Sequence, residues 1–235
     1  MSSTQYTYQQ IGIAHTPFHE KFGTPRQPGL IKEAQGRIEI TPPFNRMDAF
    51  EGLETFSHIW LLFHFHLTPE KEFQSTVRPP RLGGNERMGV FASRSPFRPN
   101  RVGQSLVKLL SVEQSEQRLI LKVEGIDLVD QTPIIDIKPY LPYCESIPEA
   151  TGGFAPTAPL QNFSVQWSPK AEAQKRMLKL DAHFERLLQG VLSLDPRPAY
   201  KKNEKESTGG LYLSGMNVKY HITQDRVTVM DVEPL

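Results

Sequence analysis

Apolar residues in the first 145 positions recur in short runs that are rich in β-branched and aromatic side chains or alternate with polar ones. Such runs, separated by Pro, Gly and polar residues, predict short strands joined by turns. Residues 57–67 are almost continuously apolar, so we expect this strand to be covered on both faces. A helical turn is expected only at residues 49–53. The predicted strands are residues 11–14, 36–40, 57–67, 89–92, 105–110, 118–126 and 133–137.

The pattern changes after residue 168. Ser168 and Pro169 suit the N-cap and first position of a helix, and apolar side chains then recur every three or four residues, which predicts one amphipathic helix. The sequence Asp-Pro-Arg-Pro at 195–198 ends that helix. Alternation at residues 218–222 and 227–229 predicts a hairpin around Gln224 and Asp225. The apolar helical positions are Met177, Leu180, Phe184, Leu187 and Val191.

These elements predict a mainly β fold with two domains. Many short strands with turn-rich connections are typical of a barrel or a sandwich, so we expect one of these two β folds over residues 1–145. Residues 146–167 contain several prolines and the pair Gly152-Gly153, which indicates a linker. Residues 168–235 then form a small α+β domain.

Composition narrows the possible functions. The 235 residues carry a net charge of +1, so a nucleic-acid site must be a local patch. The single cysteine, Cys144, excludes a disulfide framework. No apolar run is long enough to cross a membrane and no secretory signal opens the chain, so a cytoplasmic location without membrane contact is expected. The glycine fingerprints of Rossmann and P-loop nucleotide sites are absent from the sequence.

Three histidines occupy even positions of the strongest predicted strand. His58, His64 and His66 would share one face of it, and a His-x-His pair can bind zinc. A metal-dependent hydrolase is therefore one hypothesis. The alternative is that these are histidines in the core or at its rim, with satisfied hydrogen bonds. This alternative is favoured, because a zinc site needs a further ligand and the sequence does not indicate one.

The densest chemical feature is an arginine-rich stretch at residues 78–101. It holds six arginines against the single acid Glu86, a local charge of +5, interleaved with prolines and glycines. Guanidinium groups held by a stiff loop are suited to phosphate, carboxylate or the faces of aromatic rings. A charged loop that pairs with acids elsewhere in the fold is the alternative.

Within that stretch, residues 89–105 read GVFASRSPFRPNRVGQS. They closely resemble the signature of the TsaA-like family, G-x-F-A-T/S-R-S-P-x-R-P-N-P-I-G-x-S, whose bacterial members of this length are the TrmO tRNA methyltransferases. The sequence departs from it at Arg101, where proline is usual, and conservatively at Val102. Four further blocks also match, with Gln131 where glycine is common. They are residues 22–29 (FGTPRQPG), 56–65 (FSHIWLLFHF), 127–140 (DLVDQTPIIDIKPY) and 195–200 (DPRPAY).

The resemblance implies a methyltransferase that binds S-adenosylmethionine on a β-barrel, commonly as a homodimer. Its acceptor would be N6 of threonylcarbamoyladenosine (t6A) at position 37, beside the anticodon of threonine tRNAs. Asp127 or Asp130 suits the ammonium group or ribose hydroxyls of the cofactor, Arg26 or Arg94 its carboxylate, and Phe65 its adenine or sulfonium. The cofactor residues it implies are Arg26, Gln27, Pro28, His64, Phe65, Arg94, Gln104, Asp127, Leu128, Val129 and Asp130.

The acceptor side is less defined by the sequence. The N6 nitrogen carries a proton that a base can help to remove, although alignment alone can supply much of the rate; the candidate bases are Asp136, Tyr140 and Tyr143. The carboxylate of the threonyl group is a further target for an arginine. The C-terminal domain is expected to contact tRNA. The candidate RNA-binding residues are Arg98, Arg101, Arg197, Tyr200, Lys201 and Lys202.

Two alternatives remain beside the methyltransferase. A non-catalytic RNA- or cofactor-binding module would bind the same ligands without forming a methylated product. A hydrolase built on the three histidines would require a stoichiometric metal ion.

Overall fold

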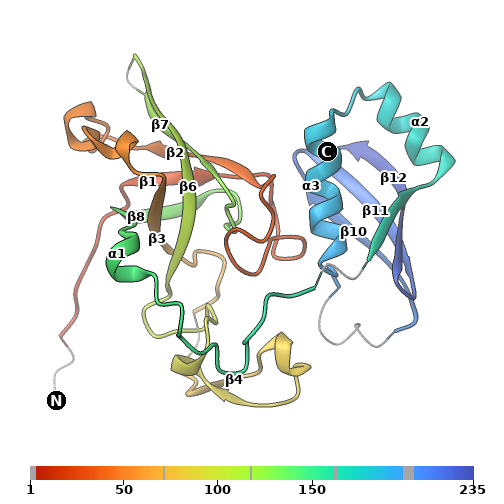
Figure 1. Cartoon of the computed structure of the whole chain (residues 1–235), viewed down its shortest axis with the longest axis horizontal. Helices are drawn as coiled ribbons and strands as arrows, with labels where there is room; N and C mark the ends of the chain where they lie inside the picture. Colours follow the sequence, from red (N-terminus) through yellow and green to blue (C-terminus); the bar gives the residue numbers. More distant parts are fainter. Residues whose placement is uncertain (1–3, 71, 117, 161–162, 198–203) are drawn as a thin grey trace.

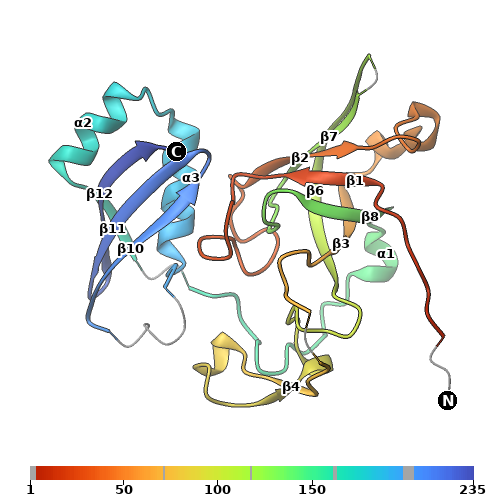
Figure 2. The same ribbon diagram turned by 180° about the vertical axis from the view of Figure 1, so that it is seen from behind.

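The computed structural model describes residues 4–70, 72–116, 118–160, 163–197 and 204–235. Figures 1 and 2 show two β-sheet domains side by side, joined by a long segment that passes beneath them. In these described residues no helix is long and apolar enough to cross a bilayer.

The N-terminal domain is a closed barrel of six antiparallel strands in the order β1-β2-β7-β6-β3-β8. Alternate residues of each strand point inward, and Ile59, Leu61 and Phe63 of β3 are buried there. The predicted barrel is thus confirmed, and the sandwich is excluded. The barrel strands are β1 (Gly12–His15), β2 (Gln35–Ile40), β3 (His58–His64), β6 (Val102–Ser115), β7 (Arg118–Glu124) and β8 (Thr132–Pro139).

Two predicted strands differ from the structure. β3 ends at His64, because the chain turns where the Thr68 N–H donates to the Phe65 carbonyl (3.1 Å), and its outward side chains are only half-buried. Residues 90–92, predicted as strand, form a 3-10 turn closed by the Ser93 N–H on the Val90 carbonyl. The short elements of the domain are η1 (Met47–Phe50), η2 (Leu53–Thr55), β4 (Thr76–Val77), η3 (Pro80–Leu82), β5 (Met88–Gly89), η4 (Val90–Ala92) and α1 (Pro142–Glu145).

The C-terminal domain is a four-stranded sheet, in the order β10-β11-β12-β9, with two helices. The predicted hairpin is the β11–β12 pair. β9 runs parallel to β12, so the last four residues of the predicted linker belong to this sheet, and β10 was not predicted. The elements are β9 (Ser164–Trp167), α2 (Pro169–Met177), α3 (Ala182–Ser193), β10 (Glu206–Leu213), β11 (Met216–Thr223) and β12 (Arg226–Pro234).

The single amphipathic helix that the sequence predicts is two helices. Ser168 caps α2 as expected, since its side chain accepts from the Ala171 N–H. Lys179 then adopts a left-handed backbone conformation (φ 52°), and Asp181 caps α3 by accepting from the Phe184 N–H at 2.8 Å. The apolar spacing continues across this break because both helices pack against the same sheet, although Met177 is exposed.

The two domains contact each other through the loop that follows β1. The Ser214 N–H donates to the Pro17 carbonyl (2.9 Å), and Phe18 forms an isolated bridge with Leu213. A β-carbon on Gly190 of α3 would lie 2.9 Å from Ile31, so the helix approaches this loop too closely for a side chain there. The C-terminal domain is therefore held beside the 16–31 loop, which also forms part of the site described below.

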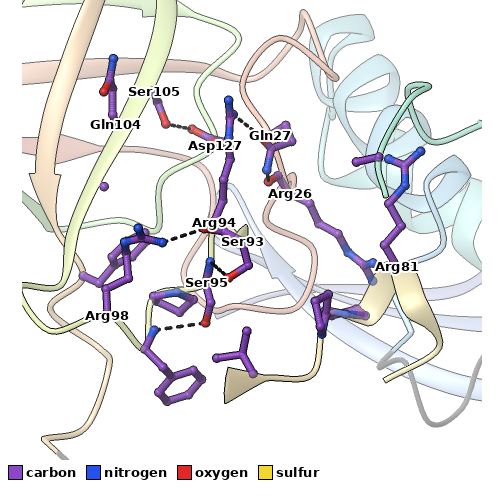
Figure 3. Close-up of a pocket in the computed structure, with 18 of the residues that line it drawn as sticks. Arg26, Gln27, Arg81, Ser93, Arg94, Ser95, Arg98, Gln104, Ser105 and Asp127 are labelled. Atoms are coloured by element: carbon purple, nitrogen blue, oxygen red, sulfur yellow. Dashed lines mark hydrogen bonds between the residues drawn. The ribbon is translucent and has the colours of Figure 1, made fainter. Parts of the chain in front are cut away.

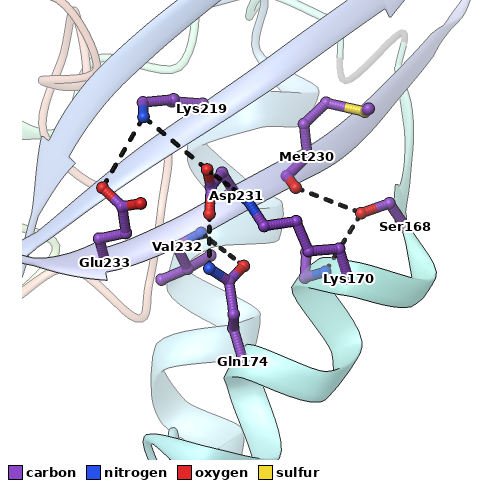
Figure 4. Close-up of polar contacts among 9 residues, drawn as sticks. Ser168, Lys170, Gln174, Lys219, Met230, Asp231, Val232 and Glu233 are labelled. Atoms are coloured by element: carbon purple, nitrogen blue, oxygen red, sulfur yellow. Dashed lines mark hydrogen bonds and ion pairs between the residues drawn. The ribbon is translucent and has the colours of Figure 1, made fainter.

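α2 is fixed to the edge of the second sheet by a polar network around Asp231 (Figure 4). Lys170 donates to Asp231 Oδ2 (2.8 Å) and Gln174 donates to Oδ1 (2.5 Å), while the Val232 N–H donates to Gln174 Oε1 (3.2 Å). The hydrogen bond from Lys170 holds the pKa of Asp231 below its usual value.

We expect Asp231→Ala to lower the free energy of unfolding by about 1–3 kcal/mol, because it removes two hydrogen bonds to a nearly buried carboxylate. Glu233→Ala is the matched control, since its exposed pairing with Lys219 (3.7 Å) contributes little. Because the pKa of Asp231 is lowered, its contribution is present at neutral pH and is lost as the pH falls through that value. Urea denaturation of the two variants at pH 7 and in acid measures both effects; equal values for the variants would contradict the account.

Candidate functional site

A cavity of about 2460 Å³ opens on the barrel wall where β3 ends and β6 begins. Its walls come from the 21–30 loop, the end of β3, the 73–98 excursion, the start of β6, the 127–132 loop and residues 152–160. Small-molecule sites usually enclose roughly 300–1,000 Å³. The cavity therefore has room for more than one small ligand.

Ten of the eleven cofactor residues that the sequence implies line this cavity. They come from four segments far apart in the chain, which the barrel topology brings together (Figure 3). The Arg94 guanidinium donates to Gln27 Oε1, which links the signature loop to the 26–28 loop. The ten residues are Arg26, Gln27, Pro28, His64, Phe65, Arg94, Gln104, Asp127, Leu128 and Val129.

Asp127 is the only acidic residue on the cavity wall among the described residues. Its carboxylate accepts a 2.6 Å hydrogen bond from Ser105 Oγ. Burial raises the pKa of Asp127 to about 6, although the Ser105 hydrogen bond and the nearby charge of Arg94 act in the opposite direction. The group is thus mostly ionised at neutral pH and close to its titration point, next to a fixed positive charge.

This shifted pKa predicts a pH dependence of cofactor binding. If ionised Asp127 accepts from the ammonium group or ribose hydroxyls of S-adenosylmethionine, affinity falls as the pH is lowered through about 6, because the carboxyl gains a proton and loses its charge. Asp127→Asn is expected to bind more weakly at pH 7 and to show a flat profile. Calorimetric titration of both proteins between about pH 5 and pH 8 measures this, and a wild-type profile without a decline in acid would contradict it.

The histidine and aromatic side chains of the wall come from the end of β3. Phe65 packs edge-on against Phe63, with ring centroids 5.1 Å apart. His64 Nδ1 lies 3.2 Å from the Tyr8 hydroxyl. Burial, and then the charge of Arg101, lower the pKa of His64, so its ring is neutral at pH 7. The His64 and Phe65 part of the wall is consequently uncharged at pH 7.

Asp130, the eleventh residue, is not on the cavity wall. Its Oδ1 accepts from the Thr16 N–H (2.9 Å) and its Oδ2 lies 3.9 Å from His19 Nδ1. These contacts join the 127–132 loop to the loop that follows β1. Of the two aspartates that suit the cofactor, the geometry favours Asp127.

None of the three candidate bases lines the cavity. Asp136 lies 3.7 Å from Lys138 Nζ, Tyr140 packs edge-on against His58 and Trp60, and Tyr143 is exposed beyond the barrel. The structure does not bring them together with the cofactor residues.

The candidate RNA-binding residues divide into three groups. Arg98 lines the cavity, whereas Arg101 donates to the Thr68 carbonyl and to Glu70 (2.8 Å). Arg197 is buried and donates to Asp195 Oδ1 (2.8 Å), so its guanidinium stabilises the 195–197 segment and is not available to a phosphate. Tyr200, Lys201 and Lys202 lie outside the described residues.

The cavity has further basic residues that the resemblance did not single out. Lys21, Arg78, Arg81 and Arg87 join Arg26, Arg94 and Arg98, which makes seven cationic side chains around one carboxylate. Arg81 donates to the Thr157 carbonyl, so the predicted linker forms part of the wall. The arginine density at 78–101 had indicated such a site, but the linker carried no sequence signal for it.

The three histidines do not form a metal site. No group of three or more His, Cys, Asp or Glu side chains placed to hold a metal ion occurs in the described part of the chain. His58 contacts Ser57 (2.9 Å) and Tyr140, and His66 lies beyond the end of β3. The structure thus gives no support to the hydrolase hypothesis.

The chain matches known proteins over almost its whole length. The model of the tRNA-methyltransferase O N-terminal domain matches residues 13–146, and that of the TrmO C-terminal domain matches residues 160–235. The tRNA (adenine(37)-N6)-methyltransferase of Escherichia coli K12 is 48% identical over 238 residues, with all of both chains covered. The human protein of the same name is 34% identical over 202 residues, 84% of this chain and 43% of its own.

A solved structure shares the whole architecture. The crystal structure of TrmO from Pseudomonas aeruginosa superposes with a TM-score of 0.78 at 35% identity, covering 98% of this chain and 99% of that one. Both domains and their arrangement are therefore those of a known fold, and the two family models account for nearly the whole chain. This chain belongs to the TrmO family of tRNA methyltransferases.

Proposed function

We propose that this protein transfers a methyl group from S-adenosylmethionine to N6 of adenine 37 in tRNA. The observation that carries the proposal is the full-length match to the Escherichia coli enzyme of that activity, 48% identical from end to end. The finer part of the proposal concerns the acceptor, which we take to be the t6A form of that adenine in threonine tRNAs. Its support is the resemblance of the signature blocks and the surplus of arginines in the cavity.

The residues of the cavity fit the proposed cofactor. S-adenosylmethionine has a carboxylate, an ammonium group, a ribose, an adenine and a cationic sulfur that carries the methyl group to be transferred. Arg94 can pair with the carboxylate, ionised Asp127 can accept from the ammonium or ribose, and Phe65 offers a ring face to the adenine or the sulfonium. A Rossmann fingerprint is unnecessary for this mode of binding.

Catalysis on this wall rests on alignment. Methyl transfer is an in-line displacement, and a sulfonium leaves as a neutral thioether, so no general acid is needed. Since Asp136, Tyr140 and Tyr143 do not line the cavity, we infer that the chain contributes mainly by holding the acceptor nitrogen in line with the methyl group.

The acceptor adenine belongs to a loop of RNA, and the basic cavity is suited to that polyanion. Arg98 lies on the cavity wall, and Arg26, Arg78 and Arg87 also line it. One of these arginines would meet the threonyl carboxylate of t6A, and others the neighbouring phosphates. Tyr200, Lys201 and Lys202, with the C-terminal domain as a whole, remain proposed contacts to the tRNA body. We also propose a cytoplasmic homodimer, on the basis of the family resemblance.

Transfer of a radiolabelled methyl group tests the proposed function. The purified protein is incubated with methyl-labelled S-adenosylmethionine and an anticodon stem-loop that carries either t6A or guanine at position 37. We expect label only in the t6A-containing loop. If the protein bound both cofactor and RNA but transferred no methyl group, the proposed enzymatic activity would be wrong and a non-catalytic binding module would be the better interpretation.

A further inference from the structure

Three phenylalanine side chains are exposed at the cavity. The exposed fractions are 72% for Phe91, 59% for Phe73 and 41% for Phe97, and all three line the cavity. Large aromatic side chains are usually buried, and a group of exposed ones marks a surface that another molecule covers. We call these three residues the aromatic ledge.

The rings of the ledge are arranged as a platform. Phe73 and Phe91 stack with ring centroids 6.5 Å apart and an interplanar angle of 30°. Arg98 places its guanidinium 5.7 Å from the Phe91 centroid, and Lys21 Nζ lies 5.9 Å from the centroid of Phe97. Each exposed ring thus lies beside a cation or another ring.

The backbone beneath the ledge is held in place. Arg98 donates to the carbonyls of Ser93 (2.7 Å) and Val90 (3.2 Å), which closes the turn that carries Phe91. The Phe97 N–H donates to Ser95 Oγ (3.2 Å). Figure 3 shows Ser93, Ser95 and Arg98 of this turn side by side. A platform fixed in this way loses little conformational entropy when a ligand covers it.

The charge of the cavity indicates which kind of molecule binds to the aromatic ledge. The cavity beside the ledge has seven cationic side chains and one carboxylate, in a chain whose net charge is +1. Unpaired nucleotides have both a π-face for the rings and a phosphate for the cations. A second copy of this chain fits less well, because a two-fold interface would place this positive surface against itself.

We propose that the aromatic ledge stacks an unpaired base of the anticodon loop that neighbours the acceptor, while Arg98 and Lys21 attract its phosphates. This inference rests on the proposed function for the identity of the RNA. It assigns a binding role to Phe73, Phe91 and Phe97, none of which is among the residues proposed to bind the cofactor.

The test compares a variant that removes the ring with one that keeps it. Phe91→Leu retains an apolar side chain, and Phe91→Trp retains an aromatic face. We expect Phe91→Leu to bind a t6A-containing anticodon stem-loop at least about fivefold more weakly than wild type, with unchanged affinity for S-adenosylmethionine. Phe91→Trp should keep the RNA affinity, and its additional tryptophan fluorescence should be quenched when the RNA binds. Leu110→Ala, an exposed apolar change on β6 outside the cavity, is the control.

If Phe91→Leu bound the RNA with the affinity of the wild type, the proposed stacking of a base on the aromatic ledge would be wrong. A change in oligomeric state of that variant by sedimentation, with RNA affinity intact, would instead assign the rings to an interface between copies. Failure of the proposed function is distinguishable, because the binding assay does not depend on methyl transfer. If the wild-type protein bound the anticodon loop through the aromatic ledge but transferred no methyl group, the proposed enzymatic function would be wrong and the proposed role of the ledge would stand.

Discussion

Arg94→Ala is expected to weaken binding of S-adenosylmethionine by about 10- to 100-fold, the range for losing hydrogen bonds to a charged group. Two effects act in the same direction. The variant lacks the guanidinium proposed to pair with the cofactor carboxylate, and it also frees Gln27, whose side chain Arg94 holds. In addition, removal of the positive charge raises the pKa of Asp127 further, so less of that carboxylate is ionised at neutral pH.

Calorimetry of the wild type, Arg94→Ala and Arg94→Lys measures this loss. Lysine keeps the charge but not the planar fork, so we expect an intermediate affinity. Arg118→Ala is the control, because Arg118 is an exposed arginine at the far end of β7 and does not line the cavity. If Arg94→Ala bound the cofactor as tightly as the wild type, the proposal that this wall of the cavity binds S-adenosylmethionine would be wrong.

Gly103→Ala is expected to lower the free energy of unfolding by about 1–3 kcal/mol, the usual cost of overpacking, and to weaken cofactor binding as well. Gly103 lies in β6 opposite Phe63. A β-carbon there would overlap the Phe63 ring and lie 2.9 Å from Phe65 Cζ. Because Phe63 is buried in the barrel, its ring cannot move freely, and the displacement is transmitted to Phe65 on the cavity wall.

Gly89→Ala is the matched control for this steric effect. A β-carbon at Gly89 would meet no atom within 4 Å, and the residue does not line the cavity. Thermal unfolding and cofactor titration of the two variants should therefore differ clearly. Equal stability and equal affinity would show that the close packing of Gly103 on the two rings is not needed for the site.

Local patterns were sufficient to predict most strands of the first domain and the hairpin, but not the ends of several elements, and the barrel was implied by the family resemblance. In β7 the polar and apolar alternation reflects which side chains face the barrel interior. In β3 the sequence is almost continuously apolar, although only alternate residues are buried. The break at Lys179 could not be predicted from periodicity, because α2 and α3 bury side chains against one sheet and keep one apolar spacing. β9 is only four residues long and is defined by its parallel pairing with β12, some 60 positions away in the chain.

The residues of the candidate site could be proposed from the sequence where they lie in recognisable blocks. The signature loop and the 127–130 segment were found in this way, and the barrel brings them together. Asp127 and Asp130 are only three residues apart, and the sequence could not tell which one faces the cavity. Two features depend on tertiary contacts and could not be predicted from the local sequence. They are the burial of Arg197 and the contribution of residues 152–160 to the cavity wall.

Nucleoside mass spectrometry tests the central claim most directly. Threonine tRNA with and without the threonylcarbamoyl group is incubated with the protein and isotopically labelled S-adenosylmethionine, then digested to nucleosides. The account predicts that t6A gains one labelled methyl group and that the unmodified adenine gains none. Labelling of adenine 37 irrespective of the threonylcarbamoyl group would contradict the proposed acceptor, and no labelling of either tRNA would contradict the methyltransferase itself.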